Sequence, residues 1–213
     1  MSMKTDHLAA YLDPLLKPEL EHLQTIRIGT KSLTFWPQRF VNDADADELL
    51  RLLERLVKAR KHVAIMAHYD HWREMMTPIA RKAIRRLRDT GVVIRTQAPL
   101  LNHINNDADT WVKMWREQVR LGMIPYYMFV ERDTGASHYF EVPLVRAWEV
   151  YKEAMQNVSG VGRTARGPSM SAGPGKVEIQ GVVEINAEKV FVLRFIQGRN
   201  PDWVQRPFFA KYD

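Results

Sequence analysis

The stretch VAIMAHYDHWREMMTPIARKAIRRLRDTGVVIRT (residues 63–96) contains one complete strand, helix and strand unit. Residues 63–67 form a short apolar run typical of a buried strand, and residues 78–89 carry apolar side chains at helical spacing. Gly91 follows this helix, as glycine commonly does, and a second apolar run covers residues 92–96. This order predicts two parallel strands joined by a crossover helix.

The same alternation continues on both sides of this unit, with a period of about 30 residues. Further strands are predicted at 26–28 and 124–130, and further helices at 43–60, 107–121 and 143–156. Four such units favour an α/β protein, either a barrel or an open doubly wound sheet. After Gly162 the period ends, and the sequence predicts a Gly/Pro/Ser loop, a hairpin over 176–195 turning at 186–188, and a tail with aromatic residues that pack back: Trp203, Phe208, Phe209 and Tyr212.

Composition limits the classes of function. The 213 residues are 46% hydrophobic, enough for one substantial core, and no apolar run reaches the roughly 18 residues of a membrane helix. The polar N-terminus does not resemble a signal peptide, so we expect a cytoplasmic protein with no membrane partner. The net charge of +6 raises the question of nucleic acid, but the basic residues of 51–61 and 81–88 alternate with apolar ones, as on solvated helix faces. No nucleic-acid partner is therefore expected.

Polar residues gather where the predicted strands end, at 29–31, 68–71, 97, 102–103 and 131–133. In both candidate architectures this end binds ligands. His68 and His71 are three residues apart, but two imidazoles without a third ligand are a weak metal signal. A contact to an anionic ligand is favoured, and no metal site is predicted.

The decapeptide GPSMSAGPGK (residues 167–176) ends in a lysine. A Walker phosphate loop is excluded, because Val177 and its neighbours continue as a strand rather than a helix. Lys176 is either a solvated loop lysine or a Schiff-base nucleophile approached through a glycine-rich turn that lets a flat cofactor lie close to the backbone. Both readings remain open on spacing alone.

Several short motifs occur in one order along the chain. They are IRIGT (26–30), PQR (37–39), His68 with His71, QAPLLNHINND (97–107), PYY (125–127) and GPGK (173–176). In this order and spacing they resemble the lysine 2,3-aminomutase family of radical S-adenosylmethionine (SAM) enzymes, over nearly the whole chain from about Lys4. The resemblance makes Lys176 the expected pyridoxal phosphate lysine.

The resemblance implies a partial TIM barrel with six strands in the family. Residues 1–158 would supply about four of its strand–helix units, and residues 159–213 the pyridoxal phosphate lysine loop, a β-hairpin extension and the tail. It also implies an isomerase in which a [4Fe-4S] cluster cleaves S-adenosylmethionine. The resulting radical abstracts hydrogen from an amino acid held on pyridoxal phosphate, and the amine migrates to the neighbouring carbon.

Residue roles follow from the same resemblance. Cofactor-facing residues would be Lys176, His68, Gln97, Gly173 and Gly175, and substrate-facing residues would be Ser171 with Arg132 or Asp133. Lysine-specific members of the family carry an aspartate where Ser171 stands. Because a buried ammonium needs a carboxylate partner, lysine is not a safe substrate assignment.

One departure from the family is decisive. The sequence contains no cysteine, so the three-cysteine loop that binds the cluster is absent. We expect the C-terminal part of a longer enzyme, inactive in isolation, whose small-molecule substrate is an amino acid. We also expect that it forms a homo-oligomer or needs the missing N-terminal part. Two alternatives remain: a non-catalytic half-barrel that binds a partner or small molecule, and a basic nucleic-acid binder.

Overall fold

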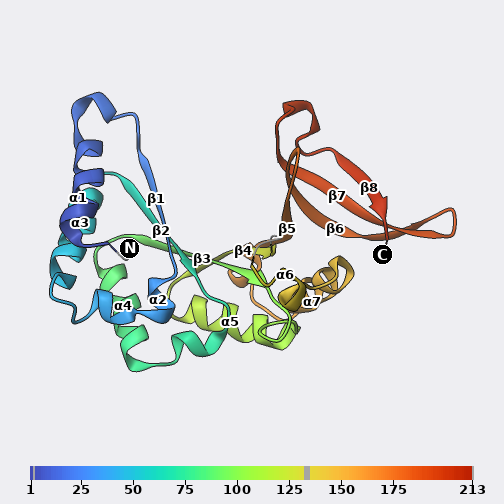
Figure 1. Ribbon diagram of the computed structural model, residues 1–213, viewed down its shortest axis with the longest axis horizontal. Helices are drawn as coiled ribbons and strands as arrows, with labels where there is room; N and C mark the ends of the chain where they lie inside the picture. The colour runs from blue at the N-terminus through green and yellow to red at the C-terminus, as the bar shows by residue number, and fades with distance from the viewer. Residues whose placement is uncertain (2, 132–134, 213) are drawn as a thin grey trace. The chain divides into compact units, whose positions relative to one another are not determined.

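The computed structural model describes residues 1, 3–131 and 135–212 (Figure 1). The chain divides into two compact units, Met1–Gln97 with Glu117–Pro125, and Ala98–Arg116 with Tyr126–Asp213. The predicted boundary near residue 158 stays a prediction.

Eight strands form one sheet in the sequential order β1 to β8. The pairs β1–β2, β2–β3 and β4–β5 are parallel, whereas β5, β6, β7 and β8 pair antiparallel. A mixed α/β fold is therefore confirmed, and the barrel remains a proposal. The strands are β1 (Thr25–Thr30), β2 (His62–His68), β3 (Val93–Leu100), β4 (Ile124–Val130), β5 (Arg166–Ala172), β6 (Gly175–Ile185), β7 (Glu188–Gly198) and β8 (Pro207–Lys211).

The predicted long helices are present at nearly the predicted positions, as α3 (Ala46–Lys58), α4 (Pro78–Asp89), α5 (Ala108–Arg120) and α7 (Leu144–Gln156). Local chemistry sets the ends of α4. The Thr77 hydroxyl accepts a hydrogen bond from the Ala80 N–H at 3.3 Å, and Gly91 beyond its C-terminus has φ +87°. No helix among the described residues is long and apolar enough to cross a bilayer. The short helices are α1 (Thr5–Leu12), η1 (Asp13–Leu16), η2 (Pro18–Leu20), α2 (Ser32–Phe35), η3 (Pro37–Phe40), η4 (Trp72–Met75), α6 (Ser137–Phe140), η5 (Gly162–Thr164) and η6 (Pro201–Trp203).

The core of the first unit lies between β2 and the apolar faces of its helices. Residues 63–67 of β2 are all buried, which is typical of a parallel strand covered on both faces. α3 contributes the leucines of its apolar face to this core, and Leu53 and Leu56 are fully buried. β3 continues to Leu100, so the prediction that Gln97 follows the strand is wrong. The reason is that residues 98–100 extend the strand as buried side chains.

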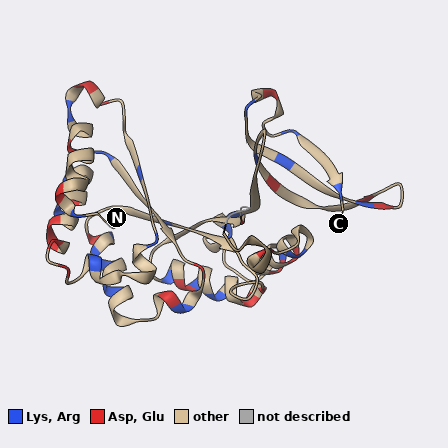
Figure 2. Ribbon diagram, viewed as in Figure 1, with Lys and Arg blue, Asp and Glu red and all other residues tan. Residues whose placement is uncertain are grey.

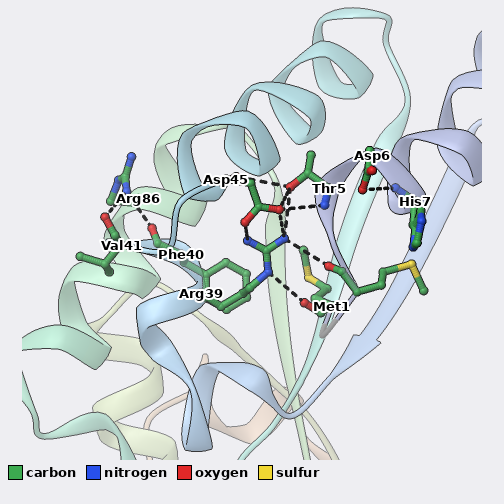
Figure 3. A network of polar contacts seen from close by, with 10 residues as sticks. Met1, Thr5, Asp6, His7, Arg39, Phe40, Val41, Asp45 and Arg86 are labelled. Carbon is green, nitrogen blue, oxygen red and sulfur yellow. Dashed lines mark hydrogen bonds and ion pairs between the residues drawn. The ribbon is translucent and has the colours of Figure 1, made fainter.

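An ion pair with a buried arginine holds the N-terminal segment of the first unit (Figure 3). Arg39 is only 1% exposed and donates to both carboxylate oxygens of Asp45, at 2.7 and 3.0 Å. Its guanidinium also donates to the Thr5 hydroxyl at 3.1 Å and to the carbonyls of Met1 and Met3. Asp45 in turn accepts from both the N–H and the hydroxyl of Thr5. The remaining donors of the buried charge are thus satisfied, as burial requires.

The expected Gly/Pro/Ser loop of the second unit is wrong. Residues 167–172 lie in β5, the turn is confined to Gly173 and Pro174, and β6 begins at Gly175. The reason is tertiary pairing: β5 has β4 on one side and β6 on the other, which satisfies its backbone. The hairpin predicted to turn at 186–188 is confirmed, because β6 and β7 are joined by Asn186 and Ala187, both with positive φ.

The tail of the second unit packs only in part as predicted. Phe208 and Tyr212 lie against the buried cluster formed by Val177, Ile179, Phe191 and Leu193, and the Trp203 ring lies 5.8 Å from that of Phe195. Phe209 is 58% exposed, so the expectation that it packs back is wrong. Successive residues of β8 point to opposite faces, and Phe209 lies on the outer one.

Candidate functional site

Lys176 is the second residue of β6, directly after the turn that leads from β5. Its register partner across the β5–β6 pair is Ser171. Lys176 is half-buried, and its Nζ lies 4.0 Å from the centroid of the Tyr127 ring. A cation over the face of a tyrosine is attracted by the ring quadrupole, so the ring holds the ammonium group at this place. The structure therefore brings Lys176, Ser171 and a buried tyrosine of β4 together.

The two glycines of the turn have different roles. A Cβ at Gly175 would lie 2.1 Å from the carbonyl oxygen of Gln197, so only glycine lets β6 approach β7 here. Gly173 has no described neighbour within 4 Å of such a Cβ and is exposed. The sequence predicts a close approach of a flat cofactor to this backbone. At Gly175 it is the neighbouring strand β7 that approaches closely. The cofactor role of both glycines stays a prediction.

Two buried hydroxyl groups lie on the strands beside Lys176. Tyr127 of β4 is 6% exposed and Ser169 of β5 is fully buried. Within the part of the chain that the structure describes, neither hydroxyl has a hydrogen-bond partner. Buried polar groups are nearly always paired, so unsatisfied ones point to a missing partner. No local pattern distinguishes Ser169, which is one of several small residues in the decapeptide.

His68 and Gln97 are neighbours in the first unit, where they pair in register at the end of the β2–β3 ladder. His68 Nε2 lies 3.2 Å from Oδ1 of Asp70, and Lys31 Nζ donates to Oδ2 of Asp70 at 2.7 Å. Burial disfavours the Asp70 carboxylate, but the hydrogen bonds from His68 and Lys31 outweigh it and lower the pKa of Asp70 below its usual value. The predicted gathering of polar residues at strand ends is thus a charged network around Asp70.

Beyond Asp70 the chain turns through His71 and Glu74. His71 Nδ1 accepts from the Arg73 N–H at 3.2 Å, and Glu74 accepts from the N–H groups of Asp70 and His71. These bonds form a capping box for the short helix η4. Burial raises the pKa of Glu74 above its usual value. His71 therefore has a structural role, and the residues described contain no group of three His, Cys, Asp or Glu arranged to hold a metal ion.

The candidate substrate residues Arg132 and Asp133 lie outside the described residues. The neighbouring Glu131 is described, and burial raises the pKa of its carboxyl above the usual value. One of its oxygens is buried and has no partner among the residues that the structure covers. Arg166 lies on the other tyrosine of β4, since it donates to the Tyr126 hydroxyl at 2.7 Å and sits 4.9 Å from its ring centroid.

Known proteins resemble this chain over most of its length. A protein of Aquifex aeolicus named "Putative L-lysine 2,3-aminomutase" is 31% identical over 194 residues, which are 90% of this chain and 50% of that protein. The glutamate 2,3-aminomutase of Clostridioides difficile is 28% identical over 76% of this chain and 35% of its own length. The L-lysine 2,3-aminomutase of Haemophilus influenzae is 30% identical over 74% of this chain and 44% of its own length. The chain spans half or less of these relatives, and no family model matches it.

Proposed function

This chain belongs to the lysine 2,3-aminomutase family, and we propose that it forms part of an amino-acid 2,3-aminomutase-like isomerase. In this proposal β1 to β4 and their helices supply about four strand–helix units of a partial TIM barrel, and β5 to β8 form the extension that carries Lys176. The isolated chain does not complete the reaction.

The observation that supports this proposal is the position of Lys176. Its half-buried amine lies on the Tyr127 ring, and the buried hydroxyls of Tyr127 and of Ser169 on the neighbouring strand have no partner among the described residues. These residues fit a flat aromatic aldehyde with polar substituents. Pyridoxal phosphate, when bound, supplies an aldehyde that condenses with amines and a ring that accepts electrons.

The chain's own residues would bind and orient. Lys176 Nζ is the nucleophile, and it attacks only after losing a proton. The Tyr127 ring shields one side of this amine from water. The hydroxyls of Tyr127 and Ser169 can hydrogen-bond a polar substituent of the bound group, which would satisfy both.

The chain has candidate contacts for S-adenosylmethionine but no ligands for the iron–sulfur cluster. His68 and Gln97 are proposed contacts for the former, because they are adjacent polar residues near the carboxyl ends of parallel strands. The cluster does not fit: the sequence has no cysteine, and its thiolate ligands would have to come from elsewhere.

Ser171 limits the substrate. It faces Lys176 across β5 and β6 with a neutral hydroxyl, so this position does not favour a cationic substrate side chain. We therefore propose an α-amino acid as the substrate class without assigning lysine. One relative is a glutamate 2,3-aminomutase, which is compatible with a substrate other than lysine.

Borohydride reduction in the presence of pyridoxal phosphate tests the proposal. Peptide mapping should place the pyridoxyl adduct on Lys176, strongly in a longer protein that contains this chain and weakly in the chain alone. Lys176→Arg should abolish the adduct, because a guanidinium keeps the charge but does not form the imine.

A matched control is available in the same unit. Lys189 Nζ also lies over a tyrosine, 5.6 Å from the Tyr212 ring, and Lys189→Arg should leave the adduct unchanged. An adduct on Lys31 or Lys189 would refute the assignment. No selective labelling of any lysine in the longer protein would favour a non-catalytic binding module.

A further inference from the structure

Four arginines line one cavity of the first unit, on the helices α4 and α5. The cavity has a volume of about 300 Å³ and is lined by Arg81, Ile84, Arg85, Arg88, Arg120 and Leu121. Figure 2 shows that lysine and arginine elsewhere are spread along both units together with acidic residues. The arginine cavity is different because four arginine side chains and two apolar ones line one space, which is partly open to solvent.

Two of the four guanidinium groups share a single carboxylate. Glu117 accepts from Arg81 at 3.0 Å and from Arg120 at 2.8 and 2.9 Å. Hydrogen bonds from Arg120 lower the pKa of Glu117, so this carboxylate stays charged near neutral pH. Glu117 can balance one of the four positive charges, and three remain.

The other two arginines differ in how they are held. Arg88 donates to the Leu121 carbonyl at 3.1 Å, and its guanidinium lies over Gly122, where a Cβ would come within 2.2 Å of Arg88 Cζ. Arg85 is exposed and has no hydrogen bond or ion pair to any residue that the structure describes. Its donors are available to a ligand.

This arrangement costs stability in the absence of an anion. Arg81 and Arg85 are four residues apart on one helix face and Arg88 is three further on, and like charges at these spacings destabilise a helix. Arg120 adds a fourth positive charge from α5. Ile84 and Leu121 form part of the cavity wall, and a ligand bound against them would lose water on that side, which strengthens its attraction to these charges.

We propose that this cavity binds a small, multiply charged phosphate anion, of the kind carried by polyphosphates and nucleoside polyphosphates. Arginine suits phosphate because its planar fork donates two parallel hydrogen bonds to adjacent oxygens. The volume is at the lower end of the range for small-molecule sites. The four arginines converge on one cavity of limited volume, which fits a compact anion better than an extended nucleic-acid backbone. The site goes beyond the proposed isomerase function, which requires no such ligand.

Calorimetric titration of inorganic tripolyphosphate into the 213-residue chain, at fixed ionic strength, tests the site. One saturable site is expected. Arg85→Gln should weaken binding at least about tenfold, because a hydrogen bond between charged groups is commonly worth that factor. Lys82→Gln removes the same charge from an exposed residue of α4 that does not line the cavity, and should change the affinity less than about twofold.

Three results would overturn the proposal. The first is the absence of saturable binding. The second is an equal loss of affinity in Arg85→Gln and Lys82→Gln, which would mean that only the overall charge matters. The third is tighter binding of duplex DNA than of tripolyphosphate with the same dependence on Arg85, which would assign the surface to nucleic acid. Because the readout is binding and not isomerisation, failure here is distinguishable from failure of the proposed function.

Discussion

The parallel strands of the first unit and the antiparallel strands of the second are stabilised in different ways. In β2, residues 63–67 are buried in succession, so both faces of the strand are covered. In β8, half-buried and exposed residues alternate, so one face of the strand packs and the other lies open. The difference is expected from the connections, since crossover helices cover parallel strands, whereas hairpins leave a face free. Position along the strand therefore predicts tolerance to substitution in β8 but not in β2.

Truncation of two neighbouring residues to alanine should show the largest difference in stability between β2 and β8. Ile65→Ala and Met66→Ala should each lower the free energy of unfolding by about 2–5 kcal/mol, since both side chains are buried, on opposite faces of β2. In β8, Phe208→Ala should destabilise, whereas Phe209→Ala should stay within about 0.5 kcal/mol. Urea titrations followed by circular dichroism measure all four. A neutral Met66→Ala would show that the second face of β2 is not packed.

Ion pairs offer a second contrast between the units. Asp45→Asn leaves Arg39 buried without a counter-charge, and should cost about 3 kcal/mol of unfolding free energy. In the second unit, Glu178→Gln breaks a pair of 2.7 Å to Arg194, whose side chain is 33% exposed and can be hydrated, so the loss should be about 1 kcal/mol. Asp43→Asn is the control for Asp45→Asn, because its side chain has no hydrogen bond within the described part of the chain. Equal losses at Asp45 and Asp43 would exclude the buried pair as the cause.

The turn before Lys176 offers a smaller test within the second unit. Gly175→Ala forces a Cβ against the Gln197 carbonyl and should cost about 1–3 kcal/mol, with weaker pairing of β6 to β7. Gly173→Ala should be almost neutral, because its Cβ meets no described atom. Thermal unfolding measures the first effect. If borohydride labelling of Lys176 falls in Gly173→Ala while stability is kept, Gly173 is needed by the ligand and not by the fold.

The sequence predicted the first unit better than the second. Helix α4 has the predicted bounds, and β2 extends the predicted run 63–67 by one residue at each end, because an amphipathic helix and a buried strand both have strong local periodicity. β5 was missed because its glycine, proline and serine residues are typical of loops, and only pairing with β4 and β6 makes the segment a strand. Local propensity contains no information about such long-range partners.

The candidate site shows the same limit. Lys176 and Ser171 are both candidates from the sequence, but their pairing across two strands depends on a turn of only two residues. The sequence predicts a longer loop here, so it does not predict this pairing. The sequence predicts the ion pair of Lys31 with Asp70, and the contact of His68 with Asp70, only as polar residues at strand ends, because the register of β1 and β2 decides which of them meet. The buried hydroxyl of Ser169 has no local signal at all.

The smallest expected difference between the two units is in how their stability depends on pH. A hydrogen bond from the Thr5 hydroxyl is the main reason that the pKa of Asp45 lies below its usual value of about 3.9. A lowered carboxyl pKa adds stability above the unfolded value, and this stability is lost as the pH falls through the folded value. Glu131 of the second unit has the opposite sign, because burial raises its pKa above the usual value of about 4.3. Its charged form lowers stability as the pH rises through the folded value.

Two substitutions use these opposite signs. Thr5→Ala should move the acid-side loss of stability to higher pH, because Asp45 then releases its proton less readily, whereas Thr5→Ser keeps the hydroxyl and should preserve the wild-type profile. Glu131→Gln should raise the urea midpoint at pH 7 and leave it unchanged well below pH 4, where the native carboxyl is already protonated. Midpoints measured from pH 3 to pH 7 give both profiles. A Glu131→Gln protein that is less stable than wild type at pH 7 would mean that the carboxylate has a favourable partner in the folded protein, and that its burial does not control its pKa.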